Sequence, residues 1–265
     1  MPDSKLYPGE QIFDDGTNES ELIPAGFSTG YKGMFRSSAQ ADALTIPFPD
    51  ELLIPESDWQ GMIEEMEERK TRVSDLVNQA GLPCKDQGQT NFCWANAPVH
   101  CLEVLRVIQN QPMVILSPAS VACPITGFRN NGGFGGDALE WLIQSGVVPV
   151  ENWPANAIDR RYYTEANKLL AREFKALEWF NLRPRNKQQH ISCLLRRIPI
   201  AVGLNYWSHE TTDYEPVWLN GQIGVRSRNS WRMDWPAPGG MGYYVRQGSK
   251  MLADDLVAPR TTTAS

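Results

Sequence analysis

Gln87-Gly88-Gln89-Thr90-Asn91-Phe92-Cys93-Trp94-Ala95-Asn96-Ala97 is a polar, glycine-bearing loop that runs into a single cysteine and then into a segment with helical spacing. Cys93 would therefore begin a helix, where unpaired backbone N–H groups and the helix dipole favour a thiolate. The thiolate is the nucleophilic form of cysteine. The alternative is a buried cysteine that acts only as a small apolar side chain. The partners that Cys93 finds elsewhere in the chain decide between the two.

Composition places the chain among soluble globular proteins. Its 265 residues suffice for one large domain or two lobes, and 42% are hydrophobic and 21% charged. No apolar run approaches the roughly 18 residues of a membrane span. The first residues, Met1–Lys5, have no apolar core behind them, so we expect no secretory signal. We therefore expect a cytoplasmic protein that does not contact a membrane.

The cysteines argue against disulfides and against a metal site. Their number is odd and no two form a C-x-x-C pair, so neither a disulfide framework nor a thiolate zinc site is expected. This pattern fits a reducing compartment, and no cofactor is predicted. The five positions are Cys84, Cys93, Cys101, Cys123 and Cys193.

Charge is distributed unevenly along the chain. Residues 1–70 hold 15 acidic and 5 basic groups, whereas the remaining 195 residues hold 16 acidic and 20 basic groups. This asymmetry and the absence of a basic run argue against nucleic acid as a partner. The acidic part is either a solvated surface or an arm that docks on the rest of the chain or on another protein.

Helical patterns dominate the first half and strand patterns the second, which indicates an α+β protein with two lobes. Prolines interrupt residues 1–58, so we expect an extended acidic N-terminal arm that wraps over the body or a partner. A helix is expected from Asp58 to about Asn78. The other expected parts are a helical lobe over residues 59–180, a β-rich lobe over 181–250 and a C-terminal tail over 251–265.

The β-rich half supplies partners for the thiol. A cysteine nucleophile needs a base and a group that orients the base. His209 directly follows a predicted strand, and Asn229 ends another. An asparagine can accept a hydrogen bond from one imidazole nitrogen without adding charge. Gln87 offers amide N–H donors for an oxyanion, beside the backbone N–H of Cys93. Together these four residues form a complete acyl-transfer set.

These residues resemble the papain-like cysteine peptidases. Gln87-Gly88, Cys93-Trp94 and Asn229-Ser230-Trp231 match the family's sequence blocks in order, with the same spacing from glutamine to cysteine. The resemblance covers about residues 80–247. It implies a papain-like two-lobed fold, with a central helix starting at the cysteine and a β-barrel-like second lobe. It also implies peptide hydrolysis by Cys93, His209 and Asn229 with Gln87 as the oxyanion donor.

The resemblance further implies where a polypeptide substrate would bind. Gly135-Gly136 looks like the paired glycines that line the family's cleft, where an extended peptide pairs with the backbone. Trp231 and Trp235 match the tryptophans of the cleft. Asn91-Phe92 replaces the small residues beside the nucleophile, and this departure suggests a narrower cleft. Together with Thr90 and Gly133, which replace two cysteines of the family's pattern, this departure makes the chain look more like a divergent bacterial or bacteriophage member.

Two other functions stay open at this point. The first is a structural or interaction protein that keeps the fold, with the arm contacting a larger assembly; a virion location would follow if the chain is phage-encoded. The second is acyl transfer or amide hydrolysis on a non-peptide substrate. The sequence leaves open whether the arm blocks the cleft or reaches away to a neighbour.

Overall fold

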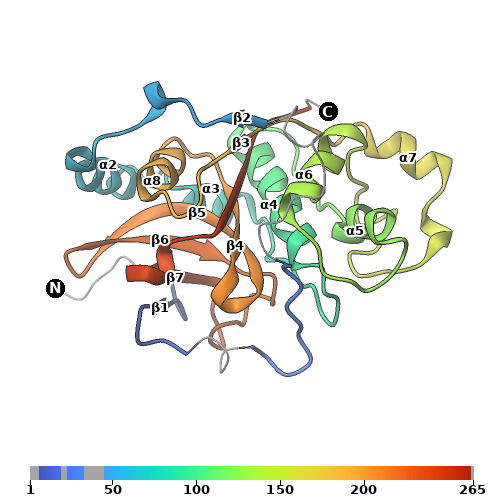
Figure 1. The fold of residues 1–265 in the computed structure, drawn as a ribbon, viewed down its shortest axis with the longest axis horizontal. Coiled ribbons are helices and arrows are strands. Elements are labelled where there is room, and N and C mark those ends of the chain that lie inside the picture. The colour runs from blue at the N-terminus through green and yellow to red at the C-terminus, as the bar shows by residue number, and fades with distance from the viewer. Residues whose placement is uncertain (1–5, 19–22, 33–44, 264–265) are drawn as a thin grey trace.

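The helix that begins at Cys93 lies at the centre of the molecule in the computed structural model, which describes residues 6–18, 23–32 and 45–263 (Figure 1). This helix, α4, spans Cys93–Ile108, and every residue from Cys93 to Arg106 is buried. A helix that is buried along nearly its whole length must be covered on all sides. Helices α5 and α6 pack on one side of α4, and strands β4, β5 and β8 pack on another.

The remaining helices fall into two groups around α4. One group forms the helical lobe and the other lies beside the sheet, as Figure 1 shows. The helical lobe holds α5 (Pro118–Thr126), α6 (Gly135–Gln144), α7 (Glu165–Ala171) and the 3-10 helix η3 (Arg160–Tyr162). Beside the sheet lie the helices α2 (Glu56–Glu68), α3 (Val73–Ala80) and α8 (Lys187–Leu195). The 3-10 helices η2 (Asp50–Leu52), η4 (Asn205–Trp207) and η5 (Gly248–Met251) also accompany the sheet.

The helix expected from Asp58 to about Asn78 is two helices. The chain leaves α2 through Lys70, which has a left-handed φ of 51°, and α3 starts three residues later. Its first turn is fixed by Asp75, whose carboxylate accepts the backbone N–H and the guanidinium of Arg72. The break turns the apolar face of α3 toward α4.

One sheet of eight strands forms the β-rich lobe, in the spatial order β1-β7-β6-β5-β4-β8-β3-β2. Its two outermost pairs, β1 with β7 and β2 with β3, are parallel, and all other neighbours are antiparallel. The strands are β1 (Gln11–Phe13), β2 (Thr45–Pro47), β3 (Ala176–Asn181), β4 (Ile200–Leu204), β5 (His209–Leu219), β6 (Gln222–Arg228), β7 (Tyr243–Gln247) and β8 (Asp255–Thr262).

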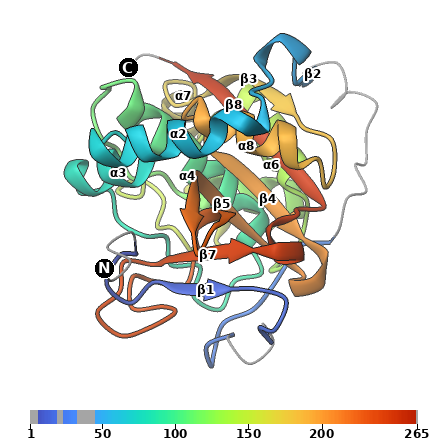
Figure 2. The same cartoon turned by 90° about the vertical axis from the view of Figure 1, so that its left-hand side faces the viewer.

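The N-terminal arm wraps over the body and supplies both edge strands of the sheet. Figure 2 shows β1 beside β7 and β2 beside β3. Glu10, just before β1, forms a buried ion pair with Arg226 of β6 at 2.6 Å. Arg226 also pairs with Glu215 of β5, again at 2.6 Å. Buried charges are costly unless paired, so this cluster fixes the start of the arm to the sheet.

The C-terminal segment is different from the tail expected over residues 251–265. Asp255–Thr262 forms β8, which lies inside the sheet between β4 and β3. Val257 and Ala258 in it are buried, because β8 packs directly against α4. Among the residues described, none of the helices has the length and apolar character of a membrane span.

Candidate active site

Cys93 is the first residue of α4 and is completely buried. Burial, followed by the charge of the nearby Glu210 carboxyl, raises the pKa of its thiol to about 12, against the opposing effect of three backbone N–H groups. The helix start was expected to favour the thiolate. In this structure desolvation outweighs the helix, so Cys93 is a neutral thiol at pH 7.

His209 opens β5 and is held by the end of β6. Its Nε2 lies 2.8 Å from Oδ1 of Asn229, and Oδ1 also accepts the backbone N–H of Ser230 at 2.7 Å. Because Oδ1 can only accept, Nε2 carries the proton of the neutral ring. Nδ1 therefore bears the lone pair; it is buried and has no hydrogen-bond partner among the described residues. The ring is oriented as a base with an unoccupied acceptor nitrogen.

Trp231 holds the imidazole plane from one face. The ring centroids of Trp231 and His209 are 4.4 Å apart, with an interplanar angle of 24°. Trp235 packs edge-on against Trp231 and is also buried. Burial lowers the pKa of His209 to about 4, although the bond to Asn229 opposes the shift. The ring is therefore neutral at pH 7.

Gln87 joins the two lobes beside the nucleophile. Its backbone N–H donates to the Ser230 carbonyl at 2.8 Å, and its side-chain oxygen accepts the Ser230 hydroxyl at 2.6 Å. These bonds fix the amide so that Nε2 can donate elsewhere. Nε2 donates to the carbonyl of Thr90 and to the carbonyl of Ser28, both at 2.8 Å. Ser230 therefore orients Gln87, a role that the sequence did not assign.

A segment of the N-terminal arm lies across these residues. We call residues 27–32 the cleft segment. The backbone N–H of Gly30 donates to Sγ of Cys93 at 3.2 Å. The Gly133 N–H donates to the Gly30 carbonyl at 2.9 Å, and the Lys32 N–H donates to the Gly133 carbonyl at 3.0 Å. The segment therefore pairs as a parallel strand with Gly133, one bridge long. It covers Cys93.

Two glycines allow this close approach. A Cβ on Gly30 would lie 2.0 Å from the Asn91 carbonyl oxygen, and a Cβ on Gly132 would lie 2.1 Å from the Gly30 oxygen. Both neighbours are backbone atoms and have little room to move. Phe27, at the other end of the cleft segment, contacts Trp231 with its ring edge at 6.2 Å between centroids.

Gly133, and neither Gly135 nor Gly136, pairs with the backbone of the cleft segment. Gly135 and Gly136 are the first two residues of α6 and are buried. Substrate contact by this pair stays a prediction, and Gly132-Gly133 is the pair that borders the cleft segment. The sequence holds both pairs within five residues, and only the three-dimensional pairing distinguishes them.

His209 contacts Asn229 and Trp231, and Gln87 bonds Ser230, which lies next to Asn229. Cys93 accepts the backbone N–H of Glu210, the residue after His209. These contacts lie where the start of α4 meets β5 and the end of β6.

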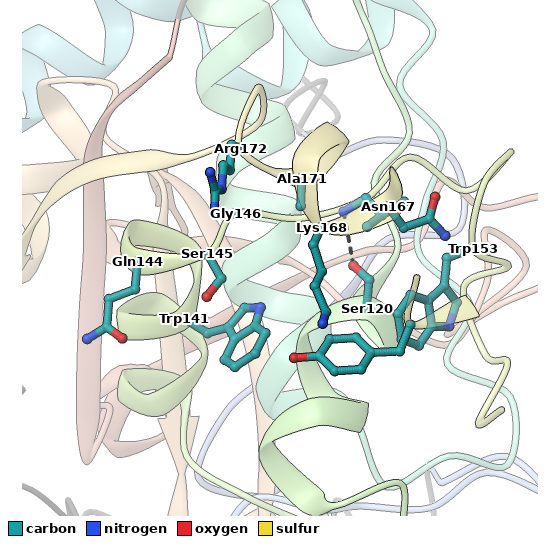
Figure 3. Close-up of a pocket in the computed structure, with 12 residues that line it drawn as sticks. Ser120, Trp141, Gln144, Ser145, Gly146, Trp153, Asn167, Lys168, Ala171 and Arg172 are labelled. Carbon is teal, nitrogen blue, oxygen red and sulfur yellow. Dashed lines mark hydrogen bonds between the residues drawn. The ribbon is translucent and has the colours of Figure 1, made fainter. Parts of the chain in front are cut away.

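A separate hollow lies in the helical lobe between α6 and α7 (Figure 3). Trp141 and Lys168 line it, and Ser120 at its base accepts the Val148 N–H at 3.0 Å. None of the candidate catalytic residues lines this hollow, so it is not part of the same site.

Two buried histidines predict acid sensitivity. Burial lowers the pKa of His100 and of His209 to about 4, below the value near 6.5 expected in an unfolded chain. Between pH 6.5 and 4 the unfolded chain thus binds up to two more protons than the folded one. The free energy of unfolding should therefore decrease as the pH is lowered through this window, by at most about 2.7 kcal/mol per pH unit.

Urea unfolding followed at half-unit steps from pH 8 to 4 measures this slope. His100→Gln should roughly halve it, because this variant removes one of the two titrating groups. Glu103, which bonds His100 at 2.9 Å, has a pKa lowered from its ordinary value of 4.5, so its contribution is lost from the acid end of this window downward. An unchanged slope in His100→Gln would contradict the assignment.

Comparison with known proteins gives matches over most of the chain. A family model described as papain family cysteine protease matches residues 70–229. Oryzain beta chain from Oryza sativa subsp. japonica is 26% identical over 164 residues, which are 60% of this chain and 34% of that protein. Digestive cysteine proteinase 3 from Homarus americanus is 26% identical over 162 residues, covering 59% and 43% of the two chains. The chain thus spans about a third to a half of such curated relatives.

Solved structures share the architecture over nearly the whole chain. Digestive procathepsin L 3 from Tenebrio molitor superposes with a TM-score of 0.66 at 14% identity, covering 92% of this chain and 79% of that one. Xylellain, a cysteine protease from Xylella fastidiosa, gives a TM-score of 0.61 at 18% identity, covering 91% and 99%. At these identities the likeness establishes a shared two-lobed fold.

Proposed function

Because the chain belongs to the papain family of cysteine proteases, we propose that it is a cysteine peptidase that hydrolyses polypeptides with Cys93 as nucleophile. In this proposal His209 is the base, Asn229 orients its ring, and Gln87 with the backbone N–H of Cys93 stabilises the oxyanion. The observation that carries the proposal is a peptide backbone held across the nucleophile. In it, the Ser28 carbonyl accepts the Gln87 amide and the Gly30 N–H contacts the thiol.

The order of the proton transfers follows from the tautomer of His209. Nδ1 takes the proton of the Cys93 thiol, and the resulting thiolate attacks the carbonyl carbon of the substrate. The oxyanion that forms accepts hydrogen bonds from Gln87 and from the Cys93 backbone. His209 then gives its proton to the leaving amine, which breaks the peptide bond. Water hydrolyses the thioester by the reverse transfer and restores the thiol.

The cleft segment must leave before a substrate can enter. The N–H of Gly30 donates to Sγ of Cys93 and so occupies the position at which a substrate would present its carbonyl carbon. Tyr31 also donates its N–H to the Ser208 carbonyl at 3.2 Å, next to His209. The segment therefore occupies the site as an inhibitor would. We infer that the closed protein is latent.

The test is peptide cleavage by the opened protein, the Gly30→Val variant considered below. We expect it to cleave a mixed peptide library, and an epoxide that blocks cleavage should modify Cys93 at least about tenfold faster than the other four thiols. Mass spectrometry of tryptic peptides locates the label. Cys193→Ala, which removes another buried thiol, should retain cleavage. Equal labelling of Cys93 and Cys84 would end the proposal.

The covered nucleophile also favours a second candidate, a non-proteolytic component of a larger assembly. In that case the cleft segment would never leave, and Cys93→Ala would not affect function. Acyl transfer to a non-peptide substrate is separated from peptide hydrolysis by the products of the library digest. We also propose a divergent bacterial or bacteriophage-type member from a reducing compartment such as the cytoplasm, on the basis of Asn91-Phe92 and five free thiols.

A further inference from the structure

The hollow between α6 and α7 takes no part in the proposed peptide hydrolysis. Its volume is about 150 Å³, and an apolar cavity of about that size can hold a benzene ring. Trp141 of α6 and Trp153 lie on opposite sides of it, and Lys168 of α7 lies between them (Figure 3). The hollow therefore has room for one aromatic ring with a small substituent.

Small, buried residues form the base of the hollow. Gly146, two residues after α6, lies so close to α7 that a Cβ on it would be 1.9 Å from the Ala171 carbonyl oxygen. The Ser120 hydroxyl donates to the Ser117 carbonyl at 2.8 Å and accepts the Val148 N–H at 3.0 Å. Because these polar groups already have partners, an apolar ring can cover the base without leaving a donor unpaired.

Aromatic rings form the walls of the hollow. The Trp153 indole N–H donates to the Ala157 carbonyl at 2.9 Å, which fixes the plane of its ring. Tyr163 packs edge-on against Trp153, with 6.5 Å between the ring centroids, and is 37% exposed. Trp141 completes the wall on the side of α6. A ligand ring can pack against such walls in offset-stacked or edge-to-face geometry.

The charged residues that line the hollow are all basic. Among the described residues that line it, none is an aspartate or a glutamate. The Lys168 ammonium lies 4.3 Å from the centroid of the Tyr163 ring and pairs at 2.7 Å with Glu165, which is outside the hollow. Arg172, at the end of α7, is exposed and donates no side-chain hydrogen bond within the described part of the chain. This lining therefore offers two cations to a ligand.

We propose that this hollow is a binding site for a single aromatic ring that carries a carboxylate. The ring would pack between Trp141 and Trp153, and the carboxylate would accept hydrogen bonds from Lys168 and Arg172. A neutral ring would lack the second interaction, and an ammonium in place of the carboxylate would be repelled. Free aromatic acids and polypeptides that end in Phe, Tyr or Trp share this chemistry. The site does not depend on the proposed peptidase function.

Calorimetry on the Cys93→Ala protein tests the site without cleavage of any probe. Phenylacetate should bind with a Kd of about 1 mM or lower, and 2-phenylethylamine at least about tenfold more weakly. Cyclohexylacetate, an aliphatic acid of similar shape, should bind about threefold or more weakly than phenylacetate, because it cannot stack. Equal affinity for phenylacetate and 2-phenylethylamine would overturn the proposal, as would a failure of phenylacetate to saturate the protein at about 20 mM.

Two substitutions locate the binding. Arg172→Gln should weaken phenylacetate binding about threefold to tenfold, because it removes one of the two cations. The matched control is Arg160→Gln, at an exposed arginine of the same lobe that does not line the hollow, and it should leave the affinity unchanged. Trp141→Ala should weaken binding at least about tenfold. Arg172→Gln alone decides if Trp141→Ala does not fold, and unchanged affinity in either folded variant would refute the site.

Titration with a tripeptide distinguishes the two sources of the ligand. Ala-Ala-Phe with a free carboxylate should bind at least about tenfold more tightly than its amide, because the amide offers no charge to the two cations. Tighter binding of this tripeptide than of phenylacetate would identify a polypeptide C-terminus as the ligand, and weaker binding a free aromatic acid. Equal binding of the tripeptide acid and its amide would contradict the role of Lys168 and Arg172.

Discussion

Replacing Gly30 by valine is expected to raise the rate at which iodoacetamide alkylates Cys93 by about 100-fold. The new Cβ would lie 2.0 Å from the Asn91 carbonyl oxygen and 2.6 Å from its carbon. These atoms belong to the backbone directly before α4, and moving them would cost more free energy than moving a flexible side chain. Overpacking of this kind costs about 1–3 kcal/mol, and about 1.4 kcal/mol corresponds to a factor of ten in the closed population.

Exposure also changes the chemistry of the thiol. Burial is the largest cause of the raised pKa of Cys93, so displacing the cleft segment lowers this pKa and increases the thiolate fraction. The matched control is Gly16→Val, which makes the same change at an exposed residue of the same arm, where the nearest atom to a Cβ is 3.4 Å away. Equal alkylation rates in Gly30→Val, Gly16→Val and the unchanged protein would mean that residues 27–32 do not control access.

In the opened protein, His209→Ala is expected to lower kcat for peptide cleavage by about 10⁴-fold or more, with KM changed little. The imidazole moves the proton between thiol and leaving amine, and loss of one member of such a set removes the function of the whole. KM depends mainly on contacts along the cleft, which this variant leaves in place. Steady-state kinetics over a substrate series separates the two constants.

The matched control for His209→Ala is His100→Gln. His100 is also buried, but it bonds Glu103 and the Tyr214 hydroxyl inside the protein, at 2.9 and 2.5 Å. This change should cost stability and leave kcat within about threefold, because the proton path is intact. If His209→Ala kept kcat within tenfold of its parent, another group would have to be the base.

The candidate catalytic residues can be proposed from the sequence because their signals are local and ordered. Gln87 and Cys93 share one loop, only three histidines exist, and Asn229 lies in a short block beside Trp231. The choice between glycine pairs could not be made, because backbone pairing depends on a segment about 100 residues away. Glu210 leaves one weak signal, an acid next to the predicted base in a strand.

The arm shows the limit of periodicity. Strands β1 and β2 have three residues each, too short for an alternating pattern to stand out, and both pair with strands far along the chain. The sequence predicts a tail over residues 251–265, and Asp255 and Pro259 interrupt the apolar run that would indicate β8. Tertiary packing against α4 and β4 determines its structure, and no local pattern reports such packing.

The arm is attached to the sheet on both sides of the cleft segment, by β1 with the Glu10–Arg226 pair before it and by β2 after it. Tethering makes rebinding intramolecular, at an effective concentration on the order of millimolar. Latency should therefore persist on dilution. A separate peptide with the sequence of residues 23–32 would have to reach a concentration similar to this effective concentration to inhibit the opened protein.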